Sequence, residues 1–487
     1  MVHTATKSPY ACAERALATQ VLVMLNDTPL IQPDRGQAAH LIHLIDPARF
    51  DAWVAAQPPR HRAAIAAQKL VAKVNSCAIL GGDEPDQWSA VGVVADVDRL
   101  SPWCLSRLAE ILPEGVYRLE QGDPGLAAFG WAVAHYRFDR YRNRQDAAVG
   151  PRILLTEKPA TIDGTIRIAD ATCQVRDLIN TPAADMGPAD LEAEAEAMAT
   201  RYGATVSVTR GDALAKDYPM IHAVGRAAAR GREPRLIELE WGNPAHPRIA
   251  LIGKGVCFDS GGLDIKNSAS MRLMKKDMGG AAHALALGNV IMAERLPVRL
   301  HLLIPAVENS VSADAFRPGD VLKTRKGLTV ENTNTDAEGR LILADALTRA
   351  VEAKPELILD FATLTGAARV ALGPDLPPLF ANDDALADAL LSAADAEADP
   401  LWRMPLWDSY DEMLKSDIAD MVNAPEGGFA GAITAALFLR RFVPSDIAWA
   451  HLDVFGWRPV LKPGRPRGGE AFALRATWRM LRERYSG

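Results

Sequence analysis

Short apolar segments alternate with amphipathic segments over most of the chain after residue 160. Apolar runs of this length predict buried strands, and apolar residues spaced at three and four positions predict helices. Their alternation predicts an α/β fold with a mainly parallel sheet flanked by helices. The predicted strands are 236–241, 248–252, 298–304, 357–362 and 447–454, and the predicted helices are 165–179, 280–295, 341–354 and 430–442.

The N-terminal part of the chain carries a weaker version of the same pattern. Helical spacing runs through residues 50–74, whereas residues 89–97 are short, apolar and strand-like. A polar, basic stretch at 136–145 is typical of a boundary region. We therefore predict a smaller α/β domain over residues 1–160, which serves in packing or assembly, and a larger domain over residues 161–487.

Composition places the chain among ordinary globular proteins. It has 487 residues, of which 48% are hydrophobic and 24% are charged, so two domains of unequal size are expected. The net charge of -7 argues against a surface built for nucleic acid. The first 20 residues lack the apolar stretch of a signal peptide, and no apolar run reaches the roughly 20 residues that cross a bilayer. We expect a cytoplasmic protein without nucleic-acid or membrane partners.

The cysteines give no sign of a disulfide framework or a zinc ribbon. They are odd in number and scattered, and none forms a CxxC pair, which predicts reduced, buried thiols. Cys257 has no histidine beside it in the sequence, so a nucleophilic role is not expected. The cysteines are Cys12, Cys77, Cys104, Cys173 and Cys257.

Charged residues gather in segments that follow the predicted strands. The Gly-rich segment 253–266 contains Lys254, Asp259 and Lys266. It matches neither GxxxxGK[ST] nor GxGxxG, which argues against a phosphate cradle. Asp277 precedes a predicted helix, a position where an acid also stabilises the helix N-terminus.

Two further carboxylates and an arginine lie at alternate positions, Asp336, Glu338 and Arg340. Alternate residues of an extended segment face the same side, so all three are expected to face one pocket. An acid cluster that caps the following helix is the alternative interpretation.

Taken together, the four carboxylates favour a metal centre. They lie in segments expected at the carboxyl ends of strands of one sheet, where ligands gather. Their mutual repulsion would be costly without cations, and two divalent ions would balance them. Oxygen ligands without histidine suit Mg or Mn, and zinc also accepts carboxylates.

Three segments resemble the metal-binding motifs of the leucyl aminopeptidases, the cytosol aminopeptidases of peptidase family M17. They are KGVCFDSGG at 254–262, KKDMGGAA at 275–282 and NTDAEGRL at 334–341, of which the last is the intact signature octapeptide of the family. The resemblance covers residues 175–480 and hardly touches the N-terminal part. Supporting segments are 180–188, 308–309, 317–320, 360–366, 416–423 and 451–453.

The resemblance implies a set of metal ligands. Asp259 and Glu338 would bridge two divalent cations. Asp336 would complete one site, and Lys254 and Asp277 would complete the other. A lysine ligand must lose its proton to coordinate, which a metal ion enforces.

The resemblance also implies catalytic and substrate-binding residues. Lys266 would polarise the scissile carbonyl, and Arg340 would anchor a bicarbonate that acts as general base. Met274, Thr363 and Gly366 match positions that line the pocket for the first side chain.

The activity implied is a two-metal aminopeptidase, with Mn, Zn or Mg as the metal, that releases leucine or another apolar N-terminal residue from short peptides. A homohexamer is implied as well. Phe455 and Arg458 depart from the small and apolar residues expected after the HLD segment, which predicts a shallower pocket. The alternatives are a DNA-binding or scaffolding member of the same fold, an inactive site on an intact fold, and a dinuclear phosphoesterase.

Overall fold

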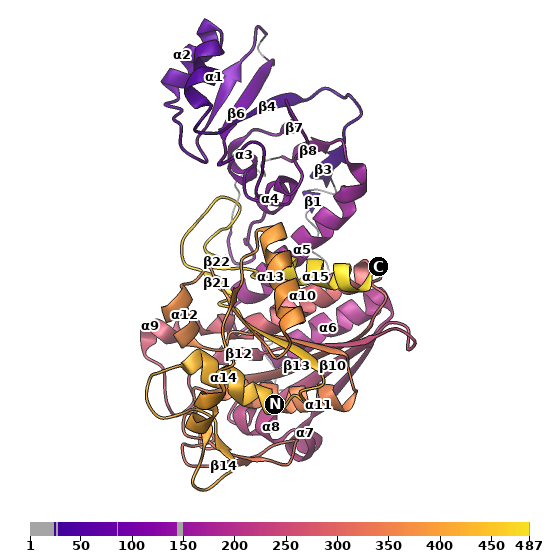
Figure 1. Cartoon of the computed structure of the whole chain (residues 1–487), viewed down its shortest axis with the longest axis vertical. Coiled ribbons are helices and arrows are strands. Elements are labelled where there is room, and N and C mark those ends of the chain that lie inside the picture. The colour runs from indigo at the N-terminus through magenta and orange to yellow at the C-terminus, as the bar shows by residue number, and fades with distance from the viewer. Residues whose placement is uncertain (1–23, 26–27, 85, 144–149, 487) are drawn as a thin grey trace, which may run out of the picture.

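The computed structural model describes residues 24–25, 28–84, 86–143 and 150–486. Within them the chain forms a smaller N-terminal domain and a larger C-terminal domain, each built on its own sheet (Figure 1). This arrangement confirms the predicted α/β class. Cys12 and the N-terminal 20 residues lie outside the described part of the chain.

The smaller domain contains a six-stranded sheet in the order β3-β8-β7-β4-β6-β5, in which β5 is antiparallel to β6 and the other pairs are parallel. The helical spacing predicted over 50–74 forms two helices instead of one, because Pro58 lacks the N–H group that a continuous helix needs and Pro59 begins a new helix. The second helix ends at Ala67, before the predicted end. The strands are β3 (Ile31–Pro33), β4 (His40–Ile45), β5 (Cys77–Gly81), β6 (Trp88–Val93), β7 (Gly115–Leu119) and β8 (Arg152–Thr156), and the helices are α1 (Phe50–Ala56), α2 (Pro59–Ala67), α3 (Ser106–Ile111) and α4 (Ala127–Val133).

The larger domain is built on a nine-stranded mixed sheet in the order β18-β17-β20-β16-β11-β13-β10-β9, with β12 paired beside β13. The central strands β20, β16, β11 and β13 are parallel, whereas β10 is antiparallel to both β13 and β9, and β17 is antiparallel to β20. Strand β13 continues to Asn309, beyond the predicted end at 304. The strands are β9 (Thr205–Arg210), β10 (Arg235–Trp241), β11 (Arg248–Gly253), β12 (Gly255–Asp259), β13 (Arg299–Asn309), β16 (Leu357–Ala362), β17 (Pro378–Ala381), β18 (Trp402–Arg403) and β20 (Ala448–Asp453).

Helices cover both faces of the large sheet, and the strand residues divide between them with a period of two. In β11, Ile249 and Leu251 join the hydrophobic cluster that includes α5, α6, α10, α13 and α15. Ala250 and Ile252 join the cluster that includes α7, α8, α11 and α14. Burial on both faces explains the continuous apolar runs of these strands. The helices are α5 (Ile162–Asn180), α6 (Pro188–Tyr202), α7 (Gly211–Asp217), α8 (Pro219–Gly225), α10 (Gly279–Ala293), α11 (Glu338–Glu352), α13 (Asp384–Glu397), α14 (Gly431–Arg440) and α15 (Leu474–Tyr485).

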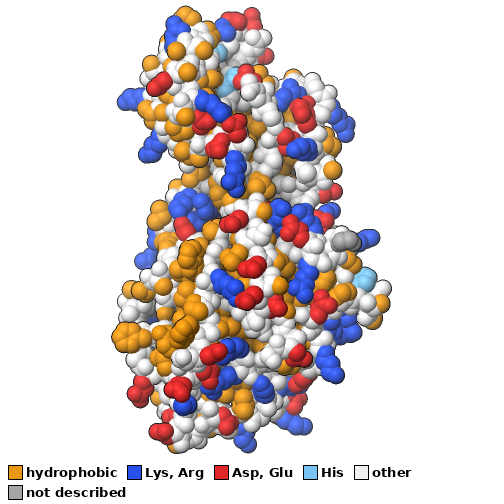
Figure 2. Space-filling model, viewed as in Figure 1, with side chains coloured by type: hydrophobic (Ala, Val, Ile, Leu, Met, Phe, Trp, Pro, Cys, Tyr) orange, Lys and Arg blue, Asp and Glu red, His pale blue; other side chains and the backbone are white. Residues whose placement is uncertain are grey.

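Short elements complete the fold and place several of the predicted site residues. In the described residues, no helix is both long and apolar enough to cross a membrane. Acidic and basic side chains are interspersed over the visible face of both domains (Figure 2). The short elements are β1 (Met24–Leu25), β2 (Thr28–Pro29), β14 (Val321–Lys323), β15 (Thr329–Glu331), β19 (Met421–Val422), β21 (Trp457–Arg458), β22 (Gly468–Gly469), α9 (Ser268–Met271), α12 (Gly366–Leu372), and the 3-10 helices η2 (Pro159–Thr161), η3 (Met274–Met278) and η4 (Asp408–Leu414).

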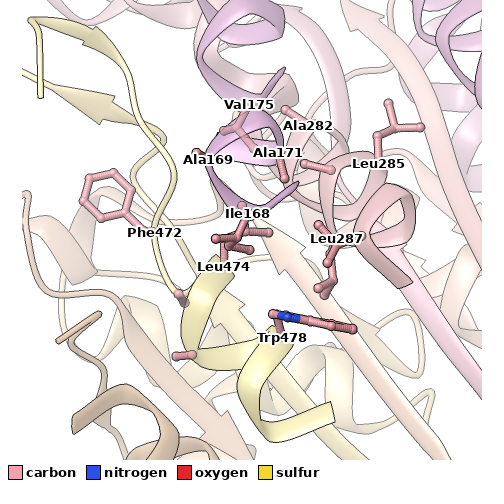
Figure 3. Packing of buried hydrophobic residues seen from close by; sticks show 14 of the residues in the cluster. Ile168, Ala169, Ala171, Val175, Ala282, Leu285, Leu287, Phe472, Leu474 and Trp478 are labelled. Atoms are coloured by element: carbon pink, nitrogen blue, oxygen red, sulfur yellow. The ribbon is translucent and has the colours of Figure 1, made fainter. Parts of the chain in front are cut away.

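Helix α5 connects the cores of the two domains. Its residues Ile168 and Val175 belong to the same hydrophobic cluster as Ala282 of α10 and Leu474 of α15, and Figure 3 shows Ala282 beside Val175. The same hydrophobic cluster includes Trp131 of α4 in the smaller domain. The two domains therefore share a continuous apolar core.

Four cysteines lie in the described part of the chain, and none of them forms a disulfide. Cys173 and Cys257 are buried as predicted, but Cys77 and Cys104 are half-buried, so the prediction of burial is wrong for these two. Burial raises the pKa of the Cys257 thiol well above its ordinary value. This thiol is therefore protonated and unsuited to nucleophilic chemistry.

Candidate metal centre

Four buried or half-buried carboxylates meet at the carboxyl edge of the large sheet. Asp259 ends β12, and Asp277 lies in η3 immediately before α10. Asp336 lies in the loop before α11, and Glu338 is the first residue of that helix. One carboxylate oxygen from each of Asp259, Asp336 and Glu338 lies within 4.8 Å of the other two. This spacing allows the three carboxylates to share a cation.

Lys254 lies directly after β11 and is almost completely buried. Its Nζ lies 2.7 Å from Asp277 Oδ2 and 2.8 Å from Glu338 Oε1, and it donates a hydrogen bond of 3.0 Å to the carbonyl oxygen of Thr363. A Cβ atom at Gly339 would lie 2.6 Å from Lys254 Cε. Glycine at this position therefore allows the first turn of α11 to approach the lysine.

Lys266 pairs with the other two carboxylates. Its Nζ lies 2.8 Å from Asp259 Oδ2 and forms an ion pair with Asp336. Each lysine thus joins two of the four acids. Two ammonium groups against four carboxylates leave an excess of negative charge in a site that is largely closed to water.

The electrostatics of the acids reflect this excess. Burial, together with the charge of Asp259, raises the pKa of Glu338 to about 8 and that of Asp336 to about 6, although the lysines oppose the shift. Burial also acts to raise the pKa of Asp277, but Lys254 and Lys276 outweigh it and lower that pKa. The acids around Asp259 therefore repel one another, and further positive charge would stabilise their ionised forms.

The donor set fits divalent cations. Among the described residues, Glu338 Oε2 is buried without a hydrogen-bond partner. Burial acts to lower the pKa of Lys254, but the charges of Asp277 and Glu338 raise it by more, so the lysine is protonated without a metal ion. Its Nζ lies where a coordinating amine would lie. A divalent cation displaces such a proton, as metal binding does at other ligands. Carboxylates with one amine suit Mn or Zn, and carboxylates alone suit Mg.

The prediction that Asp336, Glu338 and Arg340 alternate along an extended segment is wrong, because α11 begins at Glu338. Asp336 and Glu338 still reach the same centre, but Arg340 lies in the helix. Its Nη1 donates a 2.7 Å hydrogen bond to the carbonyl oxygen of Asn423, and its Nε has no partner among the described residues. Burial lowers the pKa of Arg340 to about 10, against the opposing charge of Glu338.

Two asparagines that the sequence motifs include without a role support the acids. Asn309 Nδ2 donates to Asp259 Oδ1 at 2.9 Å and to the carbonyl oxygen of Thr335 at 3.0 Å. Asn423 Oδ1 accepts from the backbone N–H of Thr333 at 2.8 Å, in the segment that leads to Asp336. The position of Asn309 at the end of β13 is the signal that points to it.

The three residues predicted to bind substrate occupy different positions. Thr363 Oγ1 donates to Asp277 Oδ1 at 2.8 Å, which joins it directly to the acid centre. Met274 begins η3 and is half-buried. Gly366 begins α12, and a Cβ atom there would meet open space.

The two departures from the family pattern have separate environments. The ring centroid of Phe455 lies 5.1 Å from the Nζ of Lys276 and 5.9 Å from the guanidinium carbon of Arg369. Arg458 is buried, and it donates to Glu470 Oε2 at 3.0 Å and to Asp375 Oδ1 at 2.9 Å. The Arg458 guanidinium is thus paired within the protein.

Comparison with known proteins extends over both domains. The sequence profile described as "Cytosol aminopeptidase family, catalytic domain" matches residues 173–477. The profile described as "M17 aminopeptidase, N-terminal domain" matches residues 41–150, a part of the chain where the motifs gave little indication of the family.

Individual relatives are similar over most of their length. The probable cytosol aminopeptidase of Syntrophotalea carbinolica is 42% identical over 362 residues, covering 71% of this chain and 72% of that protein. The 1.8 Å crystal structure of the cytosol aminopeptidase from Coxiella burnetii has a TM-score of 0.87 and 43% identity, covering 94% of this chain and 100% of that chain. The bottromycin maturation enzyme BotP in complex with Mn has a TM-score of 0.82 and 31% identity, covering 92% of this chain and 99% of that chain.

The fold, these similarities and the buried centre of acids and lysines define a metal-dependent peptidase. The chain belongs to the cytosol aminopeptidase family, peptidase family M17.

Proposed function

We propose that the protein is a two-metal aminopeptidase that releases N-terminal residues from short peptides. The observation that carries this proposal is the buried cluster in which Lys254 and Lys266 each join two carboxylates. An exopeptidase follows from the chemistry of the amine. A free N-terminal amine has a lone pair that can bind a metal ion, whereas the lone pair of an internal amide is delocalised.

The same geometry supports an assignment of the metal ligands. Asp259 and Glu338 would be the ligands that the two cations share, and Asp336 would complete the first site, in keeping with the mutual proximity of their oxygens. Lys254 and Asp277, which lie 2.7 Å apart, complete the second site. When bound, the two cations supply Lewis acidity and an activated water. The amino and carboxylate donors favour Mn or Zn over Mg, and the BotP relative was solved in complex with Mn.

Lys266 and Arg340 have separate roles in this proposal. Lys266 donates to the substrate carbonyl oxygen as negative charge grows there, an electrostatic role typical of oxyanion stabilisation. Arg340 would hold a bicarbonate, which would supply a general base at the site. Its buried Nε, which has no partner within the described residues, is available to such an anion.

Met274, Thr363 and Gly366 line the pocket for the first side chain in this proposal, and leucine or another apolar residue is the expected substrate class. Thr363 supports this location because it contacts Asp277. Gly456 lies beside Thr363, since a Cβ atom at Gly456 would be 3.3 Å from Thr363 Cγ2. Phe455 precedes Gly456 in the chain, and its ring lies near the side-chain cations of Lys276 and Arg369. In this proposal the ring reduces the depth of the pocket.

Phe455→Ala is expected to raise kcat/KM for Leu-p-nitroanilide relative to Ala-p-nitroanilide. Removing the ring makes room for the carbon atoms that leucine has and alanine lacks. One methylene group in an apolar pocket changes kcat/KM by roughly 10- to 200-fold. The measurement is the ratio of kcat/KM for the two anilides in the parent and the variant. An equal change for both substrates would show that Phe455 does not line this pocket.

We further propose a homohexamer in the cytoplasm, with residues 1–160 serving in packing and assembly and residues 161–487 forming the catalytic domain. The absence of a membrane-spanning helix in the described residues fits this setting. Nucleic acid is not an expected partner, because the net charge is -7.

Exhaustive chelation tests the proposed function directly. Hydrolysis of Leu-p-nitroanilide is expected to disappear on chelation and to return when Mn, Zn or Mg is restored separately. Activity that survives chelation would exclude the metal mechanism. Hydrolysis of p-nitrophenyl phosphate in place of the anilide would favour a phosphoesterase, and hydrolysis of neither substrate would favour a scaffolding or DNA-binding role.

A further inference from the structure

Asp453 is a buried acid beside the candidate metal centre that is not among the proposed metal ligands. It ends β20, where it lies opposite Ala362 at the end of β16, and it is 1% exposed. The segment that follows Ala362 leads directly into α12. The position of Asp453 therefore places it next to the loop formed by residues 363–365.

The Asp453 carboxylate holds this loop through both of its oxygens. Oδ1 accepts from the backbone N–H of Leu364 at 3.0 Å, and Oδ2 accepts from the hydroxyl of Thr365 at 2.7 Å. Thr365 is also the N-cap of α12. Arg369 in the same helix supplies the opposite charge, with its Nη2 3.3 Å from Asp453 Oδ1 and donating to the Asp453 carbonyl oxygen at 2.5 Å.

The loop in turn holds two of the proposed metal ligands. The carbonyl oxygen of Thr363 accepts from Lys254 Nζ at 3.0 Å. The hydroxyl of Thr363 donates to Asp277 Oδ1 at 2.8 Å. Thr363 thus contacts both residues assigned to the second cation. The carbonyl of Thr363 and the N–H of Leu364 that Asp453 binds belong to the same planar peptide unit.

Asn423 and Asn309 support the other acids of the centre, and their contacts can be compared with those of Asp453. Asn309 contacts Asp259, and Asn423 contacts the segment before Asp336. Among the described residues, the Asp453 side chain forms no hydrogen bond or ion pair with Asp259 or Asp336. Its effect is therefore directed at the second site.

We propose that Asp453 is a positioning residue for the metal centre, which fixes Thr363 so that Lys254 and Asp277 are held in place for the second cation. This inference rests on the proposed two-metal function. Groups that hydrogen-bond to metal ligands orient them, and removal of such groups weakens metal binding by roughly 10- to 100-fold.

Single-site backgrounds separate the two cations in the test. Asp336→Asn leaves the Lys254 and Asp277 site, and Asp277→Asn leaves the Asp336 site. Asp453→Asn is added to each background, and Mn²⁺ affinity is measured by calorimetry on the full chain. The expected result is a loss of about 10- to 100-fold in the Asp336→Asn background and no change in the Asp277→Asn background.

A second variant guards against a simple failure to fold. Asp453→Asn leaves the half-buried Arg369 without its carboxylate, so Asp453→Asn is also combined with Arg369→Met, which removes the unpaired cation. The same selective loss of Mn²⁺ affinity is expected, and excess Mn²⁺ should restore anilide hydrolysis in an otherwise parental centre. Equal affinity losses in both backgrounds, or no loss in either, would overturn the positioning role alone. A parent protein that binds no Mn²⁺ would overturn both this role and the proposed function.

Discussion

Asp336→Asn is expected to abolish turnover while leaving the metal-free protein at least as stable as the parent. The substitution removes a proposed ligand to the first cation. The loss in kcat/KM should greatly exceed the roughly 10- to 100-fold that follows from removing a residue that merely supports a ligand. Steady-state hydrolysis of Leu-p-nitroanilide measures this loss.

The expected stability of the metal-free variant follows from the local electrostatics. The side chain of Asp336 is 34% exposed and lies in a loop, so asparagine leaves no cavity. The charge of Asp259 raises the pKa of Asp336 together with burial, which shows that the two carboxylates repel each other. Lys266 retains its contact with Asp259 after the substitution. Removing one charge therefore relieves repulsion without breaking up the centre.

Thermal unfolding with and without Mn²⁺ separates these effects. A ligand that binds the native state raises its stability, so Mn²⁺ should raise the Tm of the parent by more than that of Asp336→Asn. Asp417→Asn, at an exposed loop position, removes the same charge elsewhere and should behave like the parent. The ligand assignment would be wrong if Asp336→Asn kept full activity and full stabilisation by Mn²⁺.

The sheet of the larger domain was predictable because its central strands are buried on both faces. Residues 357–362 were predicted as a strand and form β16 with the same bounds. The helix predicted at 341–354 begins three positions earlier, at Glu338. Glycine disfavours a helix interior by about 1 kcal/mol, which made Gly339 resemble a loop residue. Its close approach to Lys254 is a tertiary contact that local sequence does not reveal.

The acids and lysines of the centre could be assembled from motifs, but the groups that hold them could not. Asn423 bonds to Thr333, which lies 90 positions away in the chain. Asp453 similarly reaches Leu364 across 89 positions. Such hydrogen bonds depend on which strands are neighbours in the sheet. The sequence shows that these residues are polar and near strand ends, but not which partner each one binds.

Arg458 is a residue whose surroundings the sequence did not predict. Its place after the HLD segment, together with Phe455, predicted a shallower substrate pocket. In the structure it is 2% exposed and forms ion pairs with Glu470 and Asp375. Arg176 from α5 pairs with the same Glu470 at 3.0 Å. A buried ion-pair network of this kind depends on residues from three distant segments, so sequence position alone did not identify it.

Lys266→Ala is expected to lower kcat by about 10²- to 10³-fold while changing KM little. The ammonium group is proposed to donate to charge that develops only in the transition state, and removal of such a donor mainly affects kcat. The side chain also contacts Asp259 and Asp336, so a second explanation is loss of the metal ions. The two explanations predict opposite changes in metal affinity. Removing a cation that competes for these carboxylates should leave Mn²⁺ binding unchanged or tighter.

Arg340→Ala provides the matched control for Lys266→Ala, because it removes a different cation that is not a proposed ligand. Its loss of activity should be smaller, since water or buffer anions can replace part of the bicarbonate function. Added bicarbonate should stimulate the parent and Lys266→Ala, but not Arg340→Ala. Calorimetry with Mn²⁺ and steady-state kinetics with a bicarbonate series test both variants. Weaker Mn²⁺ binding by Lys266→Ala, or a defect confined to KM, would assign Lys266 to charge balance or substrate binding, and equal stimulation of both variants would remove Arg340 as the bicarbonate site.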